Sequence, residues 1–455
     1  MKTKIFEPLL LKFEKPDWAL NPEFGLIDTI LEQHPELFLL LEKDIVSGNK
    51  ISEFGRKDVP SVERIVRAAL YKELKQLNYR ELEYHQADSR ICDQFLKIDG
   101  GKKYSFQTYQ KYISKINQES LDNFLIELNK ISITEGLEDI DKLRMDSTVI
   151  ETNIHYPTNN ALVWDCIKES HRLLSTLSKE LKDVSYRNYL KGAKKTYYKI
   201  NVVKGKGSVE KRAKLFAKQL VTFTKSINQV SNVVKKKETY KNISIKALVY
   251  IVALEQLLPL MQKVYDFTNR REIMKENVPQ EDKIYSIYEL HTDIIIKGSR
   301  DVKFGHKVNF SSGKSNLILS CETLKGNPAD SNLFQTTIAK VIADYKIVPK
   351  SSATDGGYTS KKNLDYALDQ GIKNVVFNKI VGSMKNVTSS LNMETRLKKW
   401  RSGMEAIISN FKRKFKMSRC NWKGLAHFKS KVLWSAIAYN IRVMTGLALQ
   451  HFIKV

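Results

Sequence analysis

Cysteine is scarce in this chain of 455 residues, which has only four of them: Cys92, Cys166, Cys321 and Cys420. They are far apart in sequence and form no CxxC pair. A structural zinc site, which takes closely spaced thiolate and imidazole ligands, is therefore not expected. Isolated thiols of this number suit a reducing cytoplasm. We expect each cysteine to be a small buried hydrophobic side chain.

The sequence also lacks a long uninterrupted apolar stretch. Its most apolar segment, residues 247–261, contains Glu255 and Pro259 and is shorter than the roughly 20 residues that span a bilayer. The first 13 residues carry scattered charges and no apolar core, so no signal peptide is expected. These features favour a buried helix over 247–261 and predict no membrane partner.

Acidic residues are in deficit, because 50 Asp and Glu stand against 76 Lys and Arg and leave a formal net charge of +26. An excess this large is typical of proteins that bind a polyanion. Nucleic acid is favoured over an anionic membrane surface, since no apolar anchor is found. A chain of this length suggests about three domains.

Residues 1–135 have the pattern of several short helices. One helix is expected to start at Pro60 and to continue to about Gln76. Three further helices are expected, with their capping residues: 79–85 after Asn78 with Glu81 as a capping box, 89–96 after Asp88, and 106–116 after Ser105. Short helices with tight turns suit a helix-turn-helix DNA reader. A small helical bundle without a DNA role fits the pattern equally well.

Residues 142–157 form a short strand-like run with Asp146 in its middle, and Pro157 ends it. From about 160 to 275 the period is helical, and apolar residues from Phe216 to Val234 step by four and three. We expect three long helices that pack on one another.

This helical region is strongly basic. Between Lys179 and Lys241 it has 18 Lys or Arg and 4 acidic residues. A solvated helix face is the usual explanation of such a run, but the charge of the whole chain favours contact with DNA phosphates. The DNA-binding candidates here are Lys235, Lys236 and Lys237.

Residues 284–378 have an α/β pattern. Residues 304–310 and 317–321 are strand-like and flank a turn. Asp330 is expected to cap a helix over 331–344, and a strand over 350–354 ends directly before Asp355. Later elements are expected at 360–371 (helix), 374–377 (strand), 400–416 (helix) and 424–449 (helix).

Three carboxylates from distant segments are the candidate catalytic and metal-binding residues: Asp146, Asp355 and Glu405. Mg²⁺ takes oxygen ligands and keeps open positions for water and phosphate. Two such ions about 3.5–4 Å apart can stabilise both the attacking and the leaving oxygen. A carboxylate within one strand, a second at the end of another and a third on a helix can supply this site.

The motifs around these carboxylates resemble a known family. Asp146-Ser147-Thr148, Asp355-Gly356-Gly357-Tyr358 and the spacing of Arg401, Glu405 and Lys412 are similar to those of DDE-type transposases of bacterial insertion sequences. The closest group has the signature Y-x2-R-x3-E-x6-K, and Lys398 stands here at the position of its tyrosine. The resemblance extends over essentially the whole chain.

The resemblance implies an α/β RNase H-like catalytic core, with an all-α N-terminal DNA-binding domain and a long helical insertion after the first strand. The implied domains are 1–135 (DNA binding), 136–157 with 276–420 (core), 158–275 (basic insertion) and 421–455 (a C-terminal helix on the core). It also implies two Mg²⁺ or Mn²⁺ ions, double-stranded DNA with terminal inverted repeats and target DNA as partners, a homodimer, and a place with the nucleoid in the bacterial cytoplasm.

Further DNA contacts are predicted for Arg401, Lys412 and Lys307. Lys307 resembles a recurrent basic position of the family, and a solvent-facing strand lysine fits as well. Arg401 and Lys412 are predicted to hold phosphates of the transposon end, with ion pairs to nearby acids as the alternative. Two other functions stay open for the chain: a nuclease of the same fold that does not join strands, and a DNA-binding protein that has lost catalysis.

Overall fold

The structure is a computed structural model that describes residues 18, 21–47, 59–98, 101–203, 205, 208–240, 243–297, 301–380 and 383–453. The chain divides into two compact units. Unit 1 contains Met1–Asn153 and Asp293–Val455, and unit 2 contains Ile154–Thr292. Each unit is described by itself below.

Unit 1 begins with helices α1 (Pro22–Gln33), α2 (Glu36–Val46), α3 (Val62–Leu74), α4 (Tyr79–Asp88), α5 (Arg90–Phe95), α6 (Phe106–Ile113) and α7 (Gln118–Thr134). The predicted capping box is confirmed, because Asn78 and Glu81 exchange bonds at the start of α4. The prediction that Asp88 caps the next helix is wrong, since the Ser89 hydroxyl accepts from the Cys92 amide instead. Ser105 makes no capping bond to the backbone of α6.

A mixed sheet follows, formed by β1 (Lys142–Thr152), β2 (Asp293–Lys297), β3 (Asp301–Ser312), β4 (Ile318–Thr323), β5 (Ser351–Thr354), β6 (Asn374–Phe377) and β7 (Arg419–Cys420). Its path is β2-β3-β1-β5-β6, with β4 paired to β3 and β7 paired to β1. β1 is antiparallel to β3 and parallel to β5 and β7. Gly305 permits the close approach of β3 to β1, because a Cβ atom there would collide with the Ile150 carbonyl. The predicted hairpin and the strands before and after 360–371 are confirmed.

The helices of the core are α12 (Phe334–Tyr345), α13 (Lys361–Asp369), α14 (Leu391–Arg401), α15 (Gly403–Lys414) and α16 (Leu425–Ile453). Short 3₁₀ turns, η3 (Asp330–Leu333) and η4 (Gly356–Tyr358), precede α12 and α13. The single helix predicted over 400–416 is wrong, because the chain breaks between α14 and α15 at Ser402.

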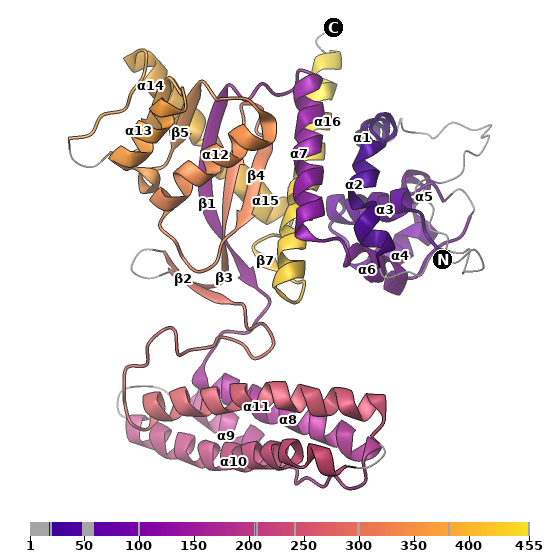
Figure 1. Cartoon of the computed structure of the whole chain (residues 1–455), viewed down its shortest axis with the longest axis vertical. Helices are drawn as coiled ribbons and strands as arrows, with labels where there is room; N and C mark the ends of the chain where they lie inside the picture. The colour runs from indigo at the N-terminus through magenta and orange to yellow at the C-terminus, as the bar shows by residue number, and fades with distance from the viewer. Residues whose placement is uncertain are drawn as a thin grey trace. The chain divides into compact units, whose positions relative to one another are not determined.

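One apolar core joins the N-terminal helices to the sheet and to α16, and α16 runs beside α7 (Figure 1). A buried polar link crosses the same contact. Asn440 on α16 donates to the Asn129 side chain on α7 over 2.9 Å and accepts from the Ile318 amide over 2.9 Å. The residues before 135 are therefore part of unit 1 and do not form a separate compact unit.

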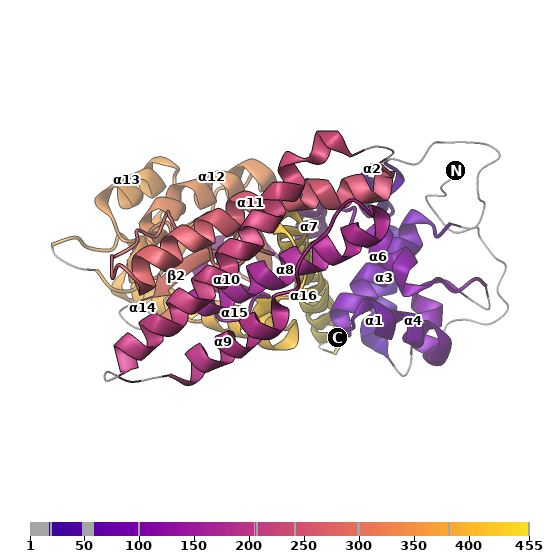
Figure 2. The same ribbon diagram turned by 90° about the horizontal axis from the view of Figure 1, so that it is seen from below.

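In the described residues of unit 2, four α-helices run alongside one another as a bundle: α8 (Asn159–Glu180), α9 (Leu190–Val202), α10 (Val209–Lys235) and α11 (Ile245–Glu272) (Figure 2). Three long helices were predicted in this region, and the shorter helix α9 was not predicted. Residues 276–292 were expected in the catalytic core. They belong to unit 2, where Val278 and Ile287 pack in the apolar core of the helices, so the sheet resumes at Asp293.

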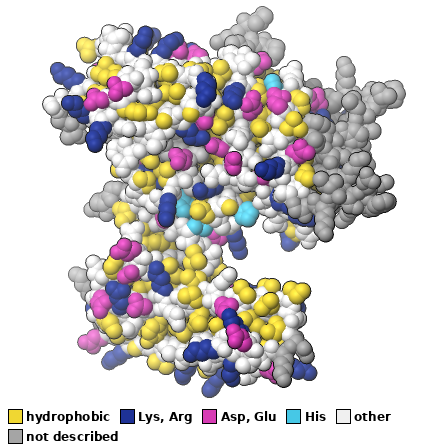
Figure 3. All heavy atoms as spheres, in the orientation of Figure 1, with side chains coloured by type: hydrophobic (Ala, Val, Ile, Leu, Met, Phe, Trp, Pro, Cys, Tyr) yellow, Lys and Arg dark blue, Asp and Glu magenta, His cyan; other side chains and the backbone are white. Residues whose placement is uncertain are grey.

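Two of the described helices, α11 and α16, are long and apolar enough to cross a membrane by length and composition. α16 is mostly buried, whereas only 28% of the apolar window of α11 is buried. The prediction of a buried helix over 247–261 is thus only partly right. Leu248 and Val249 expose about half of their surface, and apolar side chains show between charged ones over the helices of unit 2 (Figure 3).

Candidate active site

Two of the candidate carboxylates lie side by side at the middle of the sheet. Met145 of β1 pairs in parallel register with Thr354 of β5, and an aspartate follows each of them. Side chains at matched positions of neighbouring strands point to the same face. Asp146 and Asp355 therefore meet at one place, where 22% and 49% of their side-chain surface is exposed.

The guanidinium of Arg401 lies among all three candidate carboxylates. Its Nη1 is 3.9 Å from Oδ2 of Asp146 and 3.7 Å from Oδ1 of Asp355, and its Nη2 is 2.6 Å from Oε1 of Glu405. The Arg401 side chain is only 7% exposed. The structure thus brings together the three carboxylates that the sequence singled out, and it places an arginine at their centre.

A second arginine fixes the end of α14 where Arg401 lies. Arg144 of β1 is buried, and its guanidinium donates to the Trp400 carbonyl over 2.5 Å and also to the Asn316 side chain. It lies over the Trp400 ring at 4.6 Å, and burial lowers its pKa to about 10. A Cβ atom at Gly403 would collide with this guanidinium. Glycine at the first position of α15 thus makes room for Arg144, which holds the last turn of α14.

A fourth carboxylate lies next to the site, on Asp330. It accepts from the Ser147 hydroxyl over 2.8 Å and pairs with Lys307 Nζ at 2.7 Å. Asp330 was predicted to be a helix cap, and this is wrong, because no side-chain cap bond is made at α12 or η3. The position of Asp330 directly before a predicted helix suggested a cap, and nothing in the sequence indicated its contacts with Ser147 of β1 and Lys307 of β3.

Lys307 is buried rather than solvent-facing. Its side chain is 6% exposed, and its ammonium group also donates to the Pro328 carbonyl over 2.7 Å. The prediction of a solvent-facing lysine is therefore wrong. The predicted phosphate contact would require Lys307 to leave both partners.

Tyr358 supports the turn that follows Asp355. It is fully buried, and its hydroxyl donates to the Asn309 side chain over 2.8 Å. Burial raises the pKa of Tyr358 far above its ordinary value, and the nearby carboxylates of Asp330 and Asp146 raise it further. Tyr358 is therefore a neutral, fixed donor, and it anchors the two-glycine turn under the site.

The charges of the site suit a hard cation. Three carboxylates surround one guanidinium, which leaves a local excess of negative charge, and carboxylate oxygens are the ligands that Mg²⁺ and Mn²⁺ prefer. Within the described residues, however, no three His, Cys, Asp or Glu side chains are close enough together to hold a metal ion. Glu405 is 67% exposed and contacts the guanidinium of Arg401. The carboxylate ligands are thus of the type that a metal ion takes, but in this structure they are bound to Arg401.

The other predicted DNA contacts lie elsewhere. Lys412 is on α15, seven residues after Glu405, and is half-buried. Lys235 and Lys236 are exposed at the end of α10 in unit 2. Lys237 follows them and pairs with Glu255 at 2.6 Å, so one of the three predicted phosphate ligands already has an acidic partner.

Comparison with known proteins gives a match for about half of unit 1, and the matched segment contains most of the residues of this site. Residues 296–441 match a family model described as "Transposase DDE domain". The match supports a DDE-type transposase. It includes Asp355, Arg401 and Glu405 but not Asp146, and it extends over less than half of the chain. No curated protein and no solved structure matches the chain.

The matched family implies an RNase H-like core, and the sheet and helices of unit 1 are mixed α/β as that core requires. DDE transposases generally use divalent metal ions. A transposase is expected to act on DNA, and the net charge of +26 agrees with a DNA partner.

Proposed function

We propose that the chain is the DNA transposase of an insertion sequence, which cleaves DNA and transfers strands at Asp146, Asp355 and Glu405. The observation that carries this proposal is the convergence of these three carboxylates on Arg401, from β1, β5 and α15. Two of them lie inside the segment that matches the transposase domain. The third, Asp146, joins them through the register of β1 with β5.

The carboxylates would hold two Mg²⁺ or Mn²⁺ ions, whose chemistry is to activate the attacking oxygen and to stabilise the leaving one. In cleavage, a water oxygen attacks the scissile phosphorus and gives up a proton, the bond to the 3′ oxygen breaks, and the phosphate stays on the 5′ end. The released 3′ oxygen takes up a proton and becomes a 3′-hydroxyl. In strand transfer this hydroxyl attacks a phosphorus of the target DNA and gives up its proton, and the bond from that phosphorus to the target's own 3′ oxygen breaks. The protein contributes positioning, since Arg144 and Gly403 fix the helix end that carries Arg401 and Glu405.

The rest of the chain would bind the DNA. We propose that the helices before residue 135 recognise the terminal inverted repeats, that Lys235 and Lys236 contact phosphates, and that Lys412 holds the transposon end. A homodimer would bring two ends together. Arg401, which contacts carboxylates here, would reach a phosphate only after exchange of these partners.

The test is strand cleavage on DNA that carries the ends of the insertion sequence. Asp146→Asn and Asp355→Asn should each abolish cleavage in Mg²⁺ while binding of the same DNA persists, and EDTA should abolish cleavage by the wild type. Asp344→Asn is a matched control, because Asp344 lies on α12 and pairs with Lys340.

Product analysis separates the alternatives. Joined products support a transposase, and cleaved but unjoined ends would indicate a nuclease of the same fold. Specific binding without cleavage by the wild type would indicate a DNA-binding protein without catalysis. Full activity of either aspartate variant would refute the assignment of the site.

A further inference from the structure

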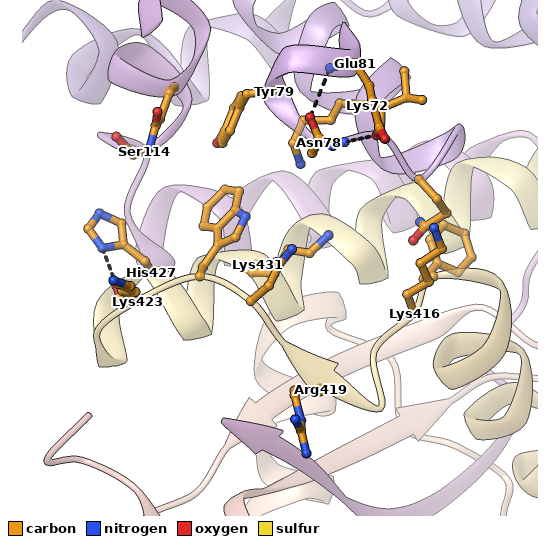
Figure 4. A pocket seen from close by; sticks show the side chains of 16 residues that line it. Lys72, Asn78, Tyr79, Glu81, Ser114, Lys416, Arg419, Lys423, His427 and Lys431 are labelled. Atoms are coloured by element: carbon orange, nitrogen blue, oxygen red, sulfur yellow. Dashed lines mark hydrogen bonds between the residues drawn. The ribbon is translucent and has the colours of Figure 1, made fainter. Parts of the chain in front are cut away.

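A pocket of about 690 Å³ lies in unit 1, away from the carboxylates. Its walls come from α3, α4 and α6 on one side and from the segment around β7 and the start of α16 on the other (Figure 4). Arg419 of β7 pairs with Glu151 of β1, five residues beyond Asp146. At about 3.3 Å per residue, Glu151 is roughly 17 Å from Asp146 along β1.

Two buried lysine side chains form the floor of this pocket, beside one buried carboxylate. Lys72 and Lys431, which are 4% and 8% exposed, both pair with the single buried carboxylate of Glu73. Burial alone would raise the pKa of Glu73, but the charges of Lys431 and Lys72 lower it to about 2. Glu73 is therefore ionised. Burial lowers the pKa of Lys72, and the charge of Lys431 lowers it further, against the attraction of Glu73. Two buried lysine side chains thus face one carboxylate, and a site with more hydrogen-bond donors than acceptors favours an anionic ligand.

The rim adds further positive charge. Lys416 and Lys423 are exposed at the pocket. The acidic residue that lines it, Glu81, accepts from the backbone amide of Asn78 over 2.7 Å as part of the helix cap. Arg419 points away from the pocket toward β1 (Figure 4) and pairs with Glu151 at 3.0 Å. Lysines thus outnumber acidic side chains among the residues that line the pocket, and the electrostatic potential inside it is positive.

One wall is aromatic. The rings of Tyr79 and Trp422 are stacked with centroids 6.2 Å apart, and Lys72 Nζ lies 4.9 Å and 5.4 Å from them. Both rings line the pocket and are half-buried. The Tyr79 hydroxyl is buried and has no hydrogen-bond partner within the described residues. Burial raises the pKa of Tyr79 far above its ordinary value, so the hydroxyl is a neutral donor that a ligand could satisfy.

We propose that this pocket receives one unpaired nucleotide of a DNA strand, with the base against Trp422 and the phosphate held by Lys416, Lys423 and the lysines of the floor. The proposal rests on the proposed function in that DNA is the substrate. Duplex phosphates need only an exposed basic surface, whereas a pocket with an aromatic wall fits a base that has left its stack. The distance of roughly 17 Å between Glu151 and Asp146 along β1 corresponds to about five nucleotides at 3.4 Å each.

The test is binding by the full chain in EDTA, which separates binding from cleavage. The probes are a fluorescein-labelled dT12 strand and a duplex of the same length, followed by fluorescence anisotropy. Stacking of a base on an aromatic ring contributes about 1–3 kcal/mol. Trp422→Leu should therefore raise the Kd for dT12 about 5- to 150-fold and leave the Kd for the duplex within twofold. Trp422→Phe should restore most of the affinity.

A charge comparison completes the experiment. Lys423→Gln should weaken binding of dT12 more than Lys429→Gln, because Lys429 does not line the pocket. Unchanged binding of dT12 by folded Trp422→Leu would refute the proposal, and equal losses for dT12 and duplex would refute it too. Failure of the proposed function would appear separately, as absent cleavage in Mg²⁺ by a protein whose dT12 binding still depends on Trp422.

Discussion

The positive charge of Arg401 lies among three carboxylates and offsets part of their negative charge. Without it, the negative charges of Asp146, Asp355 and Glu405 would repel one another with nothing between them. The same guanidinium competes with any metal ion for their oxygens. Binding of a metal ion therefore has to be coupled to a movement of Arg401, and its freed guanidinium would then be available to a phosphate.

We expect Arg401→Ala to lower the free energy of unfolding by about 1–2 kcal/mol in EDTA. The loss is below that of a fully buried ion pair because two of the carboxylates are about half-exposed or more. Added Mg²⁺ should stabilise this variant more than the wild type, since no guanidinium competes. Thermal unfolding with and without Mg²⁺ measures both effects.

Arg401→Lys is the matched control, because it keeps the charge and should respond to Mg²⁺ less than Arg401→Ala. A metal response of Arg401→Ala equal to that of the wild type would show that the arginine does not compete for the site.

Glu73 gives a prediction about pH. Its pKa is lowered from 4.5 to about 2 in the folded chain by Lys431 and Lys72, against the effect of burial. A lowered folded pKa stabilises the protein at pH above the ordinary value, and this contribution is lost as the pH falls from about 4.5 toward 2. Glu73→Gln should cost about 3–5 kcal/mol at neutral pH, because two buried ammonium groups lose their partner.

Urea unfolding at several pH values measures this effect. The difference between the wild type and Glu73→Gln should shrink as the solution becomes more acidic. A difference that stays constant down to pH 3 would contradict the assigned ion cluster.

The positions of the aspartates could be predicted from sequence because they depend on local pattern. Leu143, Met145, Val149 and Ile150 surround Asp146 in a strand-like run, and the Gly356-Gly357 turn marks the end of the strand before Asp355. Arg401 was predicted to contact phosphate, with ion pairs to nearby acids as the alternative, and the structure shows the ion pairs. Its contact with all three carboxylates could not be predicted, since it depends on the register of β1 with β5 and on the end of α14. Asp330 was mistaken for a cap because its contacts with Ser147 and Lys307 join segments far apart in sequence.

At the scale of elements, the break between α14 and α15 shapes the site. α14 ends at Arg401 and α15 begins at Gly403, so the break lies between Arg401 and Glu405, which form an ion pair across it. The sequence marks this break only by the dipeptide Ser402-Gly403, which is typical of turns, and the helical pattern on both sides of it favoured one helix. The requirement comes from Arg144, which lies against Gly403 and on a strand more than 250 residues earlier.

Gly403→Ala should therefore displace the Arg144 guanidinium and cost about 1–3 kcal/mol, the loss of buried hydrogen bonds to a charged group. In an Arg144→Ala background the same change should cost much less, since the obstacle is gone and alanine favours a helix. A double-mutant cycle by urea unfolding measures this coupling. Additive effects of the two changes would contradict the steric explanation.

At the scale of the whole molecule, the positive charge is spread over both units, and unit 2 carries a dense share of it. Lys235 and Lys236 are exposed and, among the residues that the structure describes, have no acidic partner as close as the one that Lys237 has in Glu255. Three equivalent lysines were predicted from the sequence, which cannot show that an acid on α11 lies beside the third.

Replacing both Lys235 and Lys236 with Gln should weaken binding to all DNA sequences alike. Each lost phosphate contact should reduce the slope of log K against log salt by about 0.9, so that the double change removes about 1.8. Lys237→Gln should change the slope much less. Binding titrations at several salt concentrations measure the slopes, and equal effects of all three lysines would show that the pair with Glu255 does not persist in solution.

The long path between β1 and its partner strand has a consequence for synthesis of the chain. Thr152 and Phe304, which contact each other across β1 and β3, are 152 residues apart. The central strand therefore leaves the ribosome long before β3 does, and its edges have no partner in the meantime. Unit 2, whose helices make local contacts, can fold during this delay and shorten the loop that must close. We expect substitutions that unfold unit 2, such as a charged residue at buried Phe223, to slow refolding of unit 1 and to increase aggregation of nascent chains, because residues 154–292 then form a long open loop.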